Sequence, residues 1–304
     1  MTLHIETPLI ESSALSVTTG RSVWLKLDAL QPPGSFKIRG IGQACETYLA
    51  RGARRFVSSS GGNAGLAVAY AGRRLGVPVT VVVPETTTER AKELLQLEKA
   101  EVIVNGVSWQ EANAFAQSLI GTSDAFLHPF DDPLLWQGHA TLIDEVFRFG
   151  FKPDAVVLSV GGGGLMSGVV EGLHRNGWSD VPVFAVETTG AASFHAAVEA
   201  GHTVELEQIT SIATSLGAKR VCEKAFQWSR QHSIHSVVVS DQSALNACER
   251  FLDDHRILVE PACGASLAVA YENAPELENF SNILVMVCGG ATSTIDQIRE
   301  LNGH

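Results

Sequence analysis

The stretch AVVLSVGGGGLMSGVV, residues 155–170, joins a nearly continuous apolar run to a helical pattern through four glycines. A run that does not alternate with polar residues is typical of a strand buried on both faces of a parallel sheet. Gly161, Gly162, Gly163 and Gly164 expose consecutive backbone N–H groups where the helix begins, and the helix dipole adds positive potential there. Four glycines in a row cost conformational entropy and seldom serve as a plain turn. The stretch therefore predicts an α/β unit whose turn binds a phosphate.

The same alternation of short Val-rich runs and longer helical patterns extends along the chain. Strands are predicted at residues 23–27, 56–59, 79–83, 102–104, 125–128, 155–160, 183–186, 237–239 and 283–287. Helices are predicted between them, among others at residues 64–75, 89–96, 110–119, 165–176 and 246–253. This order predicts mainly parallel sheets. The strands exceed what one small sheet needs, so we expect two doubly wound α/β domains with a ligand cleft at the carboxyl ends of the strands.

Composition and charge limit the partners of this chain. Hydrophobic residues make up 45% and charged residues 18% of its 304 residues, as in a globular protein. A net charge of −11 without a basic cluster argues against nucleic acid and against an anionic membrane surface. No apolar stretch approaches the ~20 residues that span a bilayer, and the N-terminus does not resemble a signal peptide. Five scattered cysteines without a C-x-x-C pair indicate a reducing cytoplasm and argue against a zinc module.

A second unusual strand end is the loop SSSGGNAG, residues 58–65. Its small residues let a ligand approach the backbone, and hydroxyls and free amides at a helix N-terminus bind anions such as a carboxylate. Asn63 can donate to an oxygen. A helix cap needs only one Ser or Asn, whereas six polar or glycine positions stand here in a row. The loop therefore favours a binding function.

Two further strand ends carry weaker signals. The segment from Glu187 to Ser193 could cap a helix or supply oxygens to a hard cation, and taken alone it favours the cap. Cys288, followed by two glycines, puts a small neutral group at the cleft. The usual role of such a cysteine is that of a small buried hydrophobe.

One lysine stands in an unusual setting. In GSFKIRG, residues 34–40, Lys37 follows a Gly-Ser turn behind two prolines and precedes a predicted helix. A surface lysine needs no such turn, whereas a lysine that must present its amine to one ligand atom does. A lysine that attaches to an aldehyde, together with a phosphate held elsewhere, describes pyridoxal phosphate.

The glycine turn also leaves a second class of enzyme open. Gly162, Gly164 and Ser167 approach the dinucleotide fingerprint G-x-G-x-x-G, and Glu187 lies ~20 residues further on, where a ribose-binding acid is expected. A nicotinamide-dependent oxidoreductase would use these features. It would leave Lys37 and the loop at residues 58–65 without a role.

Taken together, the motifs make the chain resemble the pyridoxal-phosphate-dependent serine/threonine dehydratases of the tryptophan-synthase-β-like fold (fold type II). The resemblance extends over essentially the whole chain. The resemblance rests on PGSFKIRG at residues 33–40, SGGNAG at 60–65, the tetraglycine, PACGA at 261–265 and VCGG at 287–290. The cysteine in the last motif makes the chain most similar to the short catabolic L-serine dehydratases.

The resemblance implies a role for each motif. Lys37 would carry the cofactor covalently and act as the catalytic base. The cofactor would contact Phe36, Lys37, Asn63, Gly161, Gly162, Gly163, Gly164, Leu165 and Cys288. The substrate carboxylate would lie against Ser60, Gly62, Asn63 and Ala64. A monovalent cation, expected to be potassium, would lie near Gly161, Glu187, Ala191, Ser193, Ser215 and Leu216.

The implied activity is the β-elimination of L-serine, L-threonine or both to pyruvate or 2-oxobutanoate and ammonia, with serine racemase and other lyases or synthases of this fold type as alternatives. In the related racemases, a serine immediately before the Gly-Asn of the substrate loop returns the proton. Gly61 stands at that position here, so we expect elimination without racemisation. We also expect a homodimer, with a large cofactor-binding domain at residues 1–42 and 133–304 and a small domain at residues 43–132.

Overall fold

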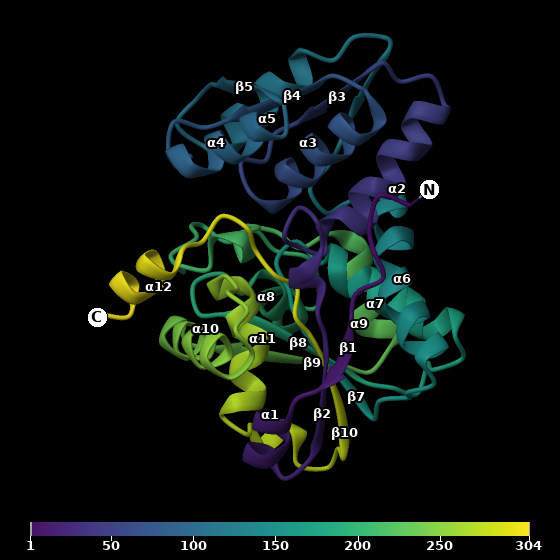
Figure 1. Ribbon diagram of the computed structural model, residues 1–304, viewed down its shortest axis with the longest axis vertical. Coiled ribbons are helices and arrows are strands. Elements are labelled where there is room, and N and C mark those ends of the chain that lie inside the picture. The colour runs from purple at the N-terminus through teal and green to yellow at the C-terminus, as the bar shows by residue number, and fades with distance from the viewer. Residues whose placement is uncertain (1, 304) are drawn as a thin grey trace.

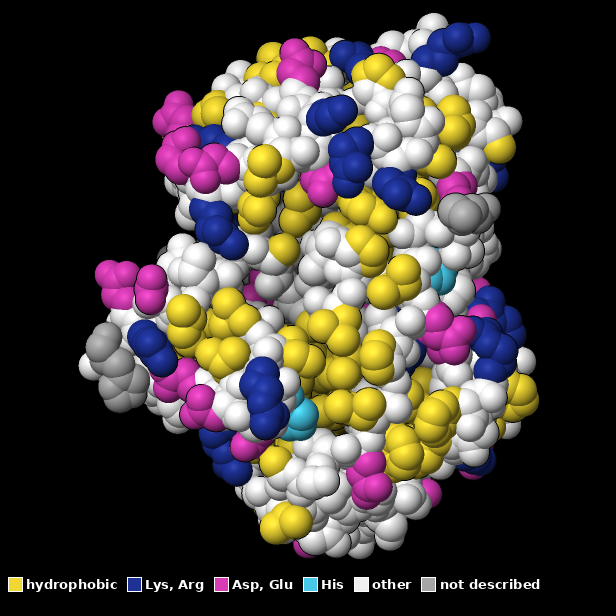
Figure 2. All heavy atoms as spheres, viewed as in Figure 1, with side chains coloured by type: hydrophobic (Ala, Val, Ile, Leu, Met, Phe, Trp, Pro, Cys, Tyr) yellow, Lys and Arg dark blue, Asp and Glu magenta, His cyan; other side chains and the backbone are white. Residues whose placement is uncertain are grey.

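The computed structural model describes residues 2–303 and contains two β-sheets, each flanked by helices and lying one above the other in Figure 1. The surface is indented between the two parts of the molecule that contain the sheets (Figure 2). The predicted α/β class with mainly parallel sheets is confirmed.

The larger sheet has the strand order β1-β2-β10-β7-β8-β9. Its strands are Leu9–Glu11, Ser22–Lys26, Asn282–Met286, Ala155–Ser159, Val183–Thr188 and Ile234–Val239. Neighbours are parallel, apart from β1 and β2, which are antiparallel. The C-terminal strand β10 lies between β2 and β7, so segments from both ends of the chain meet at one carboxyl edge.

The smaller sheet has the order β5-β4-β3-β6 and is parallel throughout. Its strands are Glu101–Val104, Val79–Val83, Arg55–Ser58 and Asp124–Phe126. The Val-rich run of β4 is buried along its whole length, which is why it does not alternate with polar residues.

Helices cover both sheets (Figure 1). They are α1 Ser13–Thr19, α2 Lys37–Ala50, α3 Asn63–Leu75, α4 Glu89–Leu97, α5 Trp109–Ser118, α6 Pro133–Phe149, α7 Gly164–Arg175, α8 Ser193–Ala200, α9 Glu223–Gln231, α10 Asp241–His255, α11 Pro261–Tyr271 and α12 Ile295–Leu301. Short 3₁₀ turns lie at Asp28–Leu30, Thr214–Leu216 and Pro275–Leu277. No helix between residues 2 and 303 combines the length and the apolar composition that a membrane crossing requires.

Two helices connect the sheets. Helix α2 packs against α3 on one side and against α6 on the other. The crossing of α2 and α6 is close, because a Cβ on Gly138 would lie 2.3 Å from the carbonyl oxygen of Arg39. The domain boundaries expected near residues 42 and 132 fall within or just before these helices and stay a prediction.

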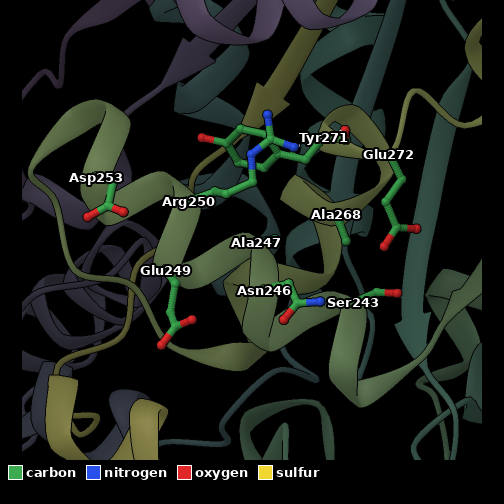
Figure 3. A pocket seen from close by; sticks show the side chains of 9 residues that line it. All are labelled: Ser243, Asn246, Ala247, Glu249, Arg250, Asp253, Ala268, Tyr271 and Glu272. Carbon is green, nitrogen blue, oxygen red and sulfur yellow. Dashed lines mark hydrogen bonds between the residues drawn. The ribbon is translucent and has the colours of Figure 1, made fainter. Parts of the chain in front are cut away.

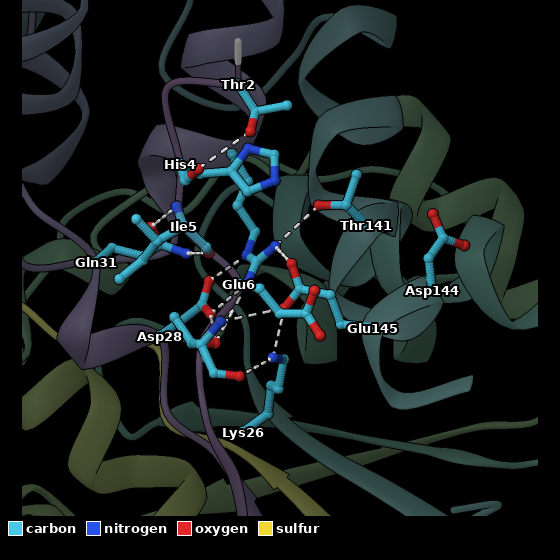
Figure 4. A network of polar contacts seen from close by, with 12 residues as sticks. Thr2, His4, Ile5, Glu6, Lys26, Asp28, Gln31, Thr141, Asp144 and Glu145 are labelled. Atoms are coloured by element: carbon cyan, nitrogen blue, oxygen red, sulfur yellow. Dashed lines mark hydrogen bonds and ion pairs between the residues drawn. The ribbon is translucent and has the colours of Figure 1, made fainter. Parts of the chain in front are cut away.

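A buried ionic network anchors the start of α2 (Figure 4). Arg39 is completely buried and contacts Asp28 at 2.7 Å and Glu145 at 2.5 Å. Lys26 completes the network with an ion pair of 2.5 Å to Glu145. Two cations and two carboxylates balance one another, as buried charges require. Because Arg39 lies two residues after Lys37, this network fixes the first turn of α2.

The predicted strands are all present, and their ends agree with the prediction to within three residues. The sequence prediction missed β1, an edge strand of three residues, Leu9–Glu11. It also placed the start of β9 at residue 237, whereas the strand begins at Ile234. Polar His235 and Ser236 are tolerated there because β9 is an edge strand of the sheet.

Candidate active site

Lys37 is the first residue of α2, and the segment before it docks on the segment that follows β10. Phe36 N donates to Cys288 O at 3.1 Å, and Gly290 N donates to Gly34 O at 2.9 Å. Gly34 has φ +79°, and a Cβ there would lie 2.8 Å from Cβ of Ala291. Two motifs at opposite ends of the chain therefore meet in one place, and the turn before Lys37 requires glycine.

The amine of Lys37 has few interactions of its own. Its Nζ donates to Pro129 O at 2.6 Å and lies 5.2 Å from the ring centroid of Phe36. Burial lowers the pKa of Lys37 to about 8, against the opposing effects of Cys288 and Glu260. A sizeable fraction of this amine is therefore neutral near pH 7 to 8, as a nucleophile or base must be.

The predicted substrate loop connects β3 to α3. Ser60 Oγ accepts a hydrogen bond from Gly62 N at 3.3 Å, and Gly62 is the N-cap residue of α3. A Cβ on Gly65 would lie 1.7 Å from Ser60 O, so the loop folds back tightly on the helix. Ala64 is buried in the first turn. The loop thus lies at a helix N-terminus, where a carboxylate is favoured.

Gly61 lies against the loop that follows β4. A Cβ on Gly61 would lie 2.8 Å from Cγ2 of Thr87 and 3.2 Å from Cγ1 of Val83. Thr87 therefore occupies the space that a side chain at residue 61 would need.

Asn63 connects the small sheet to the large one. Its Oδ1 accepts from Ala291 N at 3.1 Å, and its Nδ2 donates to Glu260 Oε1 at 2.7 Å and weakly to Ser215 Oγ at 3.4 Å. The side chain is almost completely buried. These contacts place the predicted substrate loop beside the Cys288 segment.

The tetraglycine forms the turn between β7 and α7. A Cβ on Gly162 would lie 2.3 Å from the ring of Phe130, and one on Gly163, which has φ +88°, would lie 2.4 Å from Cβ of Ala225. A Cβ on Gly164 would lie 2.7 Å from Phe130 O. Side chains are thus excluded by packing at three consecutive positions.

The hydrogen bonds of this turn use its carbonyl groups. Gly162 O accepts from Cys222 N at 3.0 Å, and Gly163 O accepts from Ser167 N at 2.9 Å. Within residues 2–303, the N–H groups of Gly161 to Leu165 have no hydrogen-bond acceptor. Unsatisfied N–H groups at a helix N-terminus form an anion site. The structure therefore agrees with a phosphate turn.

Cys288 is buried beside Cys263. A hydrogen bond with Cys263, followed by burial, raises the pKa of the Cys288 thiol well above its usual value. The thiol therefore stays neutral at physiological pH.

Glu187 is fully buried at the end of β8. Its Oε1 accepts from Phe194 N and its Oε2 from His195 N, both at 2.8 Å. Burial raises the pKa of Glu187 to about 8. This carboxylate faces α8 and is enclosed, which does not suit the ribose contact of a nicotinamide enzyme.

The sequence interpretation missed Glu260, which lies in the same cleft. Burial raises the pKa of Glu260 to about 7, although hydrogen bonds from Asn63 and Ser215 lower it. In the sequence, Glu260 precedes Pro261 at a helix start and has the pattern of an ordinary first-turn acid. Only the contact with Asn63 distinguishes it.

A separate groove of about 460 Å³ lies between α10 and α11 (Figure 3). Arg250 stacks on Tyr271 there, with the guanidinium carbon 4.3 Å from the ring centroid. None of the predicted site residues lines it, so this groove is distinct from the cleft at Lys37.

Comparisons with known proteins indicate the same class of enzyme as the residues of the cleft do. Residues 1–289 match the family model "Pyridoxal-phosphate dependent enzyme". A human protein named L-serine dehydratase/L-threonine deaminase is 49% identical over 98% of this chain and 94% of its own length. The crystal structure of an L-serine ammonia-lyase from Rhizomucor miehei has a TM-score of 0.95 at 36% identity, covering 100% of this chain and 99% of the other. The structure of maize serine racemase shares the fold, with a TM-score of 0.87 at 22% identity. The match covers 98% of this chain and 92% of the maize chain.

The cleft fits pyridoxal phosphate in three respects. The amine of Lys37, whose pKa is lowered by burial, can attach to an aldehyde. The N–H groups of the tetraglycine have no acceptor within residues 2–303 and can receive a phosphate. The neutral thiol of Cys288 can face a ring nitrogen.

Proposed function

Because the chain belongs to the family of pyridoxal-phosphate dependent enzymes, we propose that it is an ammonia-lyase that converts L-serine and L-threonine to pyruvate and 2-oxobutanoate with release of ammonia. The observation that carries the proposal is the convergence of Lys37, the Asn63 loop and the tetraglycine on one cleft. The names of the full-length relatives support the same reaction.

In this proposal, the protein holds cofactor and substrate through different groups, apart from Asn63, which contacts both. Lys37 attaches the cofactor, and Phe36 lies against its ring. Gly161, Gly162, Gly163, Gly164 and Leu165 bind the phosphate, and Cys288 faces the ring nitrogen. Ser60, Gly62, Asn63 and Ala64 bind the substrate carboxylate.

The bound cofactor supplies the electron withdrawal that makes loss of the substrate's Cα proton feasible. Lys37 takes up that proton, since its lowered pKa keeps much of the amine neutral. Cys288 remains a neutral thiol and does not pair with the ring as a carboxylate would. The weaker electron withdrawal favours prompt loss of the β-hydroxyl group. Water lost in this step returns when ammonia is released, so serine balances pyruvate plus ammonia.

We also propose a monovalent cation, potassium, at the ends of β7 and β8, near Gly161, Glu187, Ala191, Ser193, Ser215 and Leu216. In support, Ser193 Oγ is buried and has no hydrogen-bond partner within residues 2–303. A Cβ on Gly161 would lie 3.0 Å from Ser215 O, so these two turns are adjacent. No cluster of three His, Cys, Asp or Glu side chains occurs within residues 2–303, but backbone oxygens and one carboxylate suffice for a hard cation.

The remaining proposals concern assembly and location. We propose a homodimer, and division into a cofactor-binding domain at residues 1–42 and 133–304 and a substrate-loop domain at residues 43–132. A cytoplasmic location is supported by the five free cysteines.

The test of function is direct. Purified protein loaded with pyridoxal phosphate is mixed with L-serine or L-threonine, and the 2-oxo acid is measured together with ammonia. We expect equal amounts of both products and no product from the Lys37→Ala variant. A loaded, folded protein that forms no 2-oxo acid from either amino acid would refute the proposal.

A further inference from the structure

Glu260 occupies a helix-cap position without capping its helix. It is the N-cap residue of α11, and Pro261 follows at the first helical position. Its side chain makes no hydrogen bond to the first turn of α11. The carboxylate points instead to Asn63, 197 residues away in the sequence, at 2.7 Å. An ordinary capping role therefore does not explain this glutamate.

The carboxylate is also costly to bury. Glu260 is 5% exposed and forms no ion pair within 4.0 Å among residues 2–303. The backbone makes room for it, because a Cβ on Gly290 would lie 2.3 Å from Cδ of Glu260. Buried carboxylates without an ion-pair partner destabilise a fold and are concentrated at functional sites.

The contacts of Asn63 leave one orientation for its carboxamide. The Ala291 N–H can only donate, so the Asn63 atom that it meets at 3.1 Å must be the oxygen. Nδ2 therefore faces Glu260, which accepts one of its two hydrogens. The second hydrogen makes only the long contact of 3.4 Å to Ser215 Oγ. It is available to a ligand oxygen in the cleft.

The family resemblance implies that Asn63 contacts the ring oxygen of pyridoxal phosphate. We propose that Glu260 is a positioning residue, which holds the Asn63 carboxamide so that its second Nδ2 hydrogen is directed at that oxygen. This inference rests on the proposed function and deepens it. Asn63 begins α3 beside the small sheet, and Glu260 begins α11 on the large one, so the contact also fixes the distance between the substrate loop and the cofactor.

The ionisation of Glu260 tunes this contact. Its pKa is raised to about 7 by burial, and the polar and titratable groups around it are Asn63, Ser215, Lys37, Cys248 and Cys288. The ionised carboxylate accepts more strongly than the acid, because hydrogen bonds to charged groups are the stronger class. The affinity for the cofactor should therefore rise with pH through this range in the wild type. A glutamine at this position accepts through its carbonyl oxygen at every pH.

The test is a double-mutant cycle on cofactor affinity. Pyridoxal phosphate is titrated into the cofactor-free forms of the wild type, Glu260→Ala, Asn63→Ala and the double variant, and binding is followed by absorbance. We expect Glu260→Ala to weaken binding about 10- to 100-fold, as for one hydrogen bond to a charged group. The double variant should bind no more weakly than Asn63→Ala alone.

Glu260→Gln separates positioning from charge. We expect this variant to retain affinity within about threefold of the wild type at pH 8. Its affinity should rise less steeply with pH than that of the wild type, because the contribution of Glu260 is lost while that of the neutral Lys37 amine remains. The matched control is Glu272→Gln, the same substitution at the exposed end of α11, which should change nothing. Circular dichroism checks that each variant is folded. If Glu260→Ala does not fold, Glu260→Gln is used as the test variant in its place.

Three results would overturn the inference. One is an effect of Glu260→Ala that adds fully to that of Asn63→Ala. The second is a Glu260→Gln variant that binds as weakly as the alanine variant. The third is an affinity that varies with pH to the same extent in the wild type and in Glu260→Gln. A wild type that binds the cofactor but forms no 2-oxo acid would count against the proposed function alone, because the affinity cycle needs no turnover.

Discussion

Replacing Gly162 by alanine should weaken cofactor binding at the phosphate turn much more than it lowers the stability of the fold. An added Cβ would lie 2.3 Å from Cγ and Cδ2 of Phe130. Nonbonded carbons normally approach to about 3.5 Å. The ring or the turn must therefore move by about 1.2 Å, which is the shortfall between these two distances.

Phe130 has little freedom to yield. Its carbonyl oxygen accepts from Trp136 Nε1 at 2.9 Å, and its ring lies edge-on to His128 with centroids 4.7 Å apart. Overpacking of this kind costs about 1–3 kcal/mol of stability, which corresponds to a fall in Tm of about 2–5 °C for a chain of this size. The larger effect falls on the cofactor, because a displaced N–H group loses a hydrogen bond to a charged phosphate. One such bond contributes about 10- to 100-fold in affinity.

The assay is a titration of pyridoxal phosphate into the cofactor-free Gly162→Ala variant, with thermal unfolding measured in parallel. Gly121→Ala is the matched control, because Gly121 is exposed in the turn before β6 and the nearest atom to an added Cβ is Asp124 Oδ2 at 3.2 Å, a looser contact than the 2.3 Å at Gly162. It should bind the cofactor as the wild type does. If Gly162→Ala is folded and binds with unchanged affinity, the phosphate does not lie at the tetraglycine.

Other predictions concern Lys37, the substrate loop and the cation. Borohydride reduction of the loaded protein should place the pyridoxyl group on Lys37, and a label on another lysine would contradict its role. Because only a neutral amine attacks an aldehyde and burial lowers the pKa of Lys37 to about 8, the rate of reconstitution should rise with pH and level off above pH 8; a rate that falls over this range would argue against Lys37. Chiral chromatography should find pyruvate but no D-serine from L-serine, since Gly61 has no side chain to return a proton, and D-serine formed at a rate comparable to pyruvate would require another acid. Turnover in potassium should exceed turnover in a large organic cation at equal ionic strength, and equal rates would remove the cation from the proposal.

The sequence determined the features that depend on neighbouring residues. Continuous Val-rich runs predicted buried parallel strands, and Gly161–Gly164 between strand and helix predicted an anion turn. Both follow from local geometry, because periodicity reports burial and glycine reports close approach. The setting of Lys37 at a helix start was also visible, and the structure has α2 begin at this residue.

Only the tertiary structure decided what depends on residues far apart in the chain. The insertion of β10 between β2 and β7 brings Cys288 to the turn before Lys37, and no local pattern specifies that order. Thr87 filling the space beside Gly61 and the contact between Glu260 and Asn63 are likewise set by packing between elements. The local sequence of a glutamate before a proline is the same whether its carboxylate caps a helix or lies buried in a cleft. Its environment, and with it the pKa of about 7, arises only when the two sheets come together.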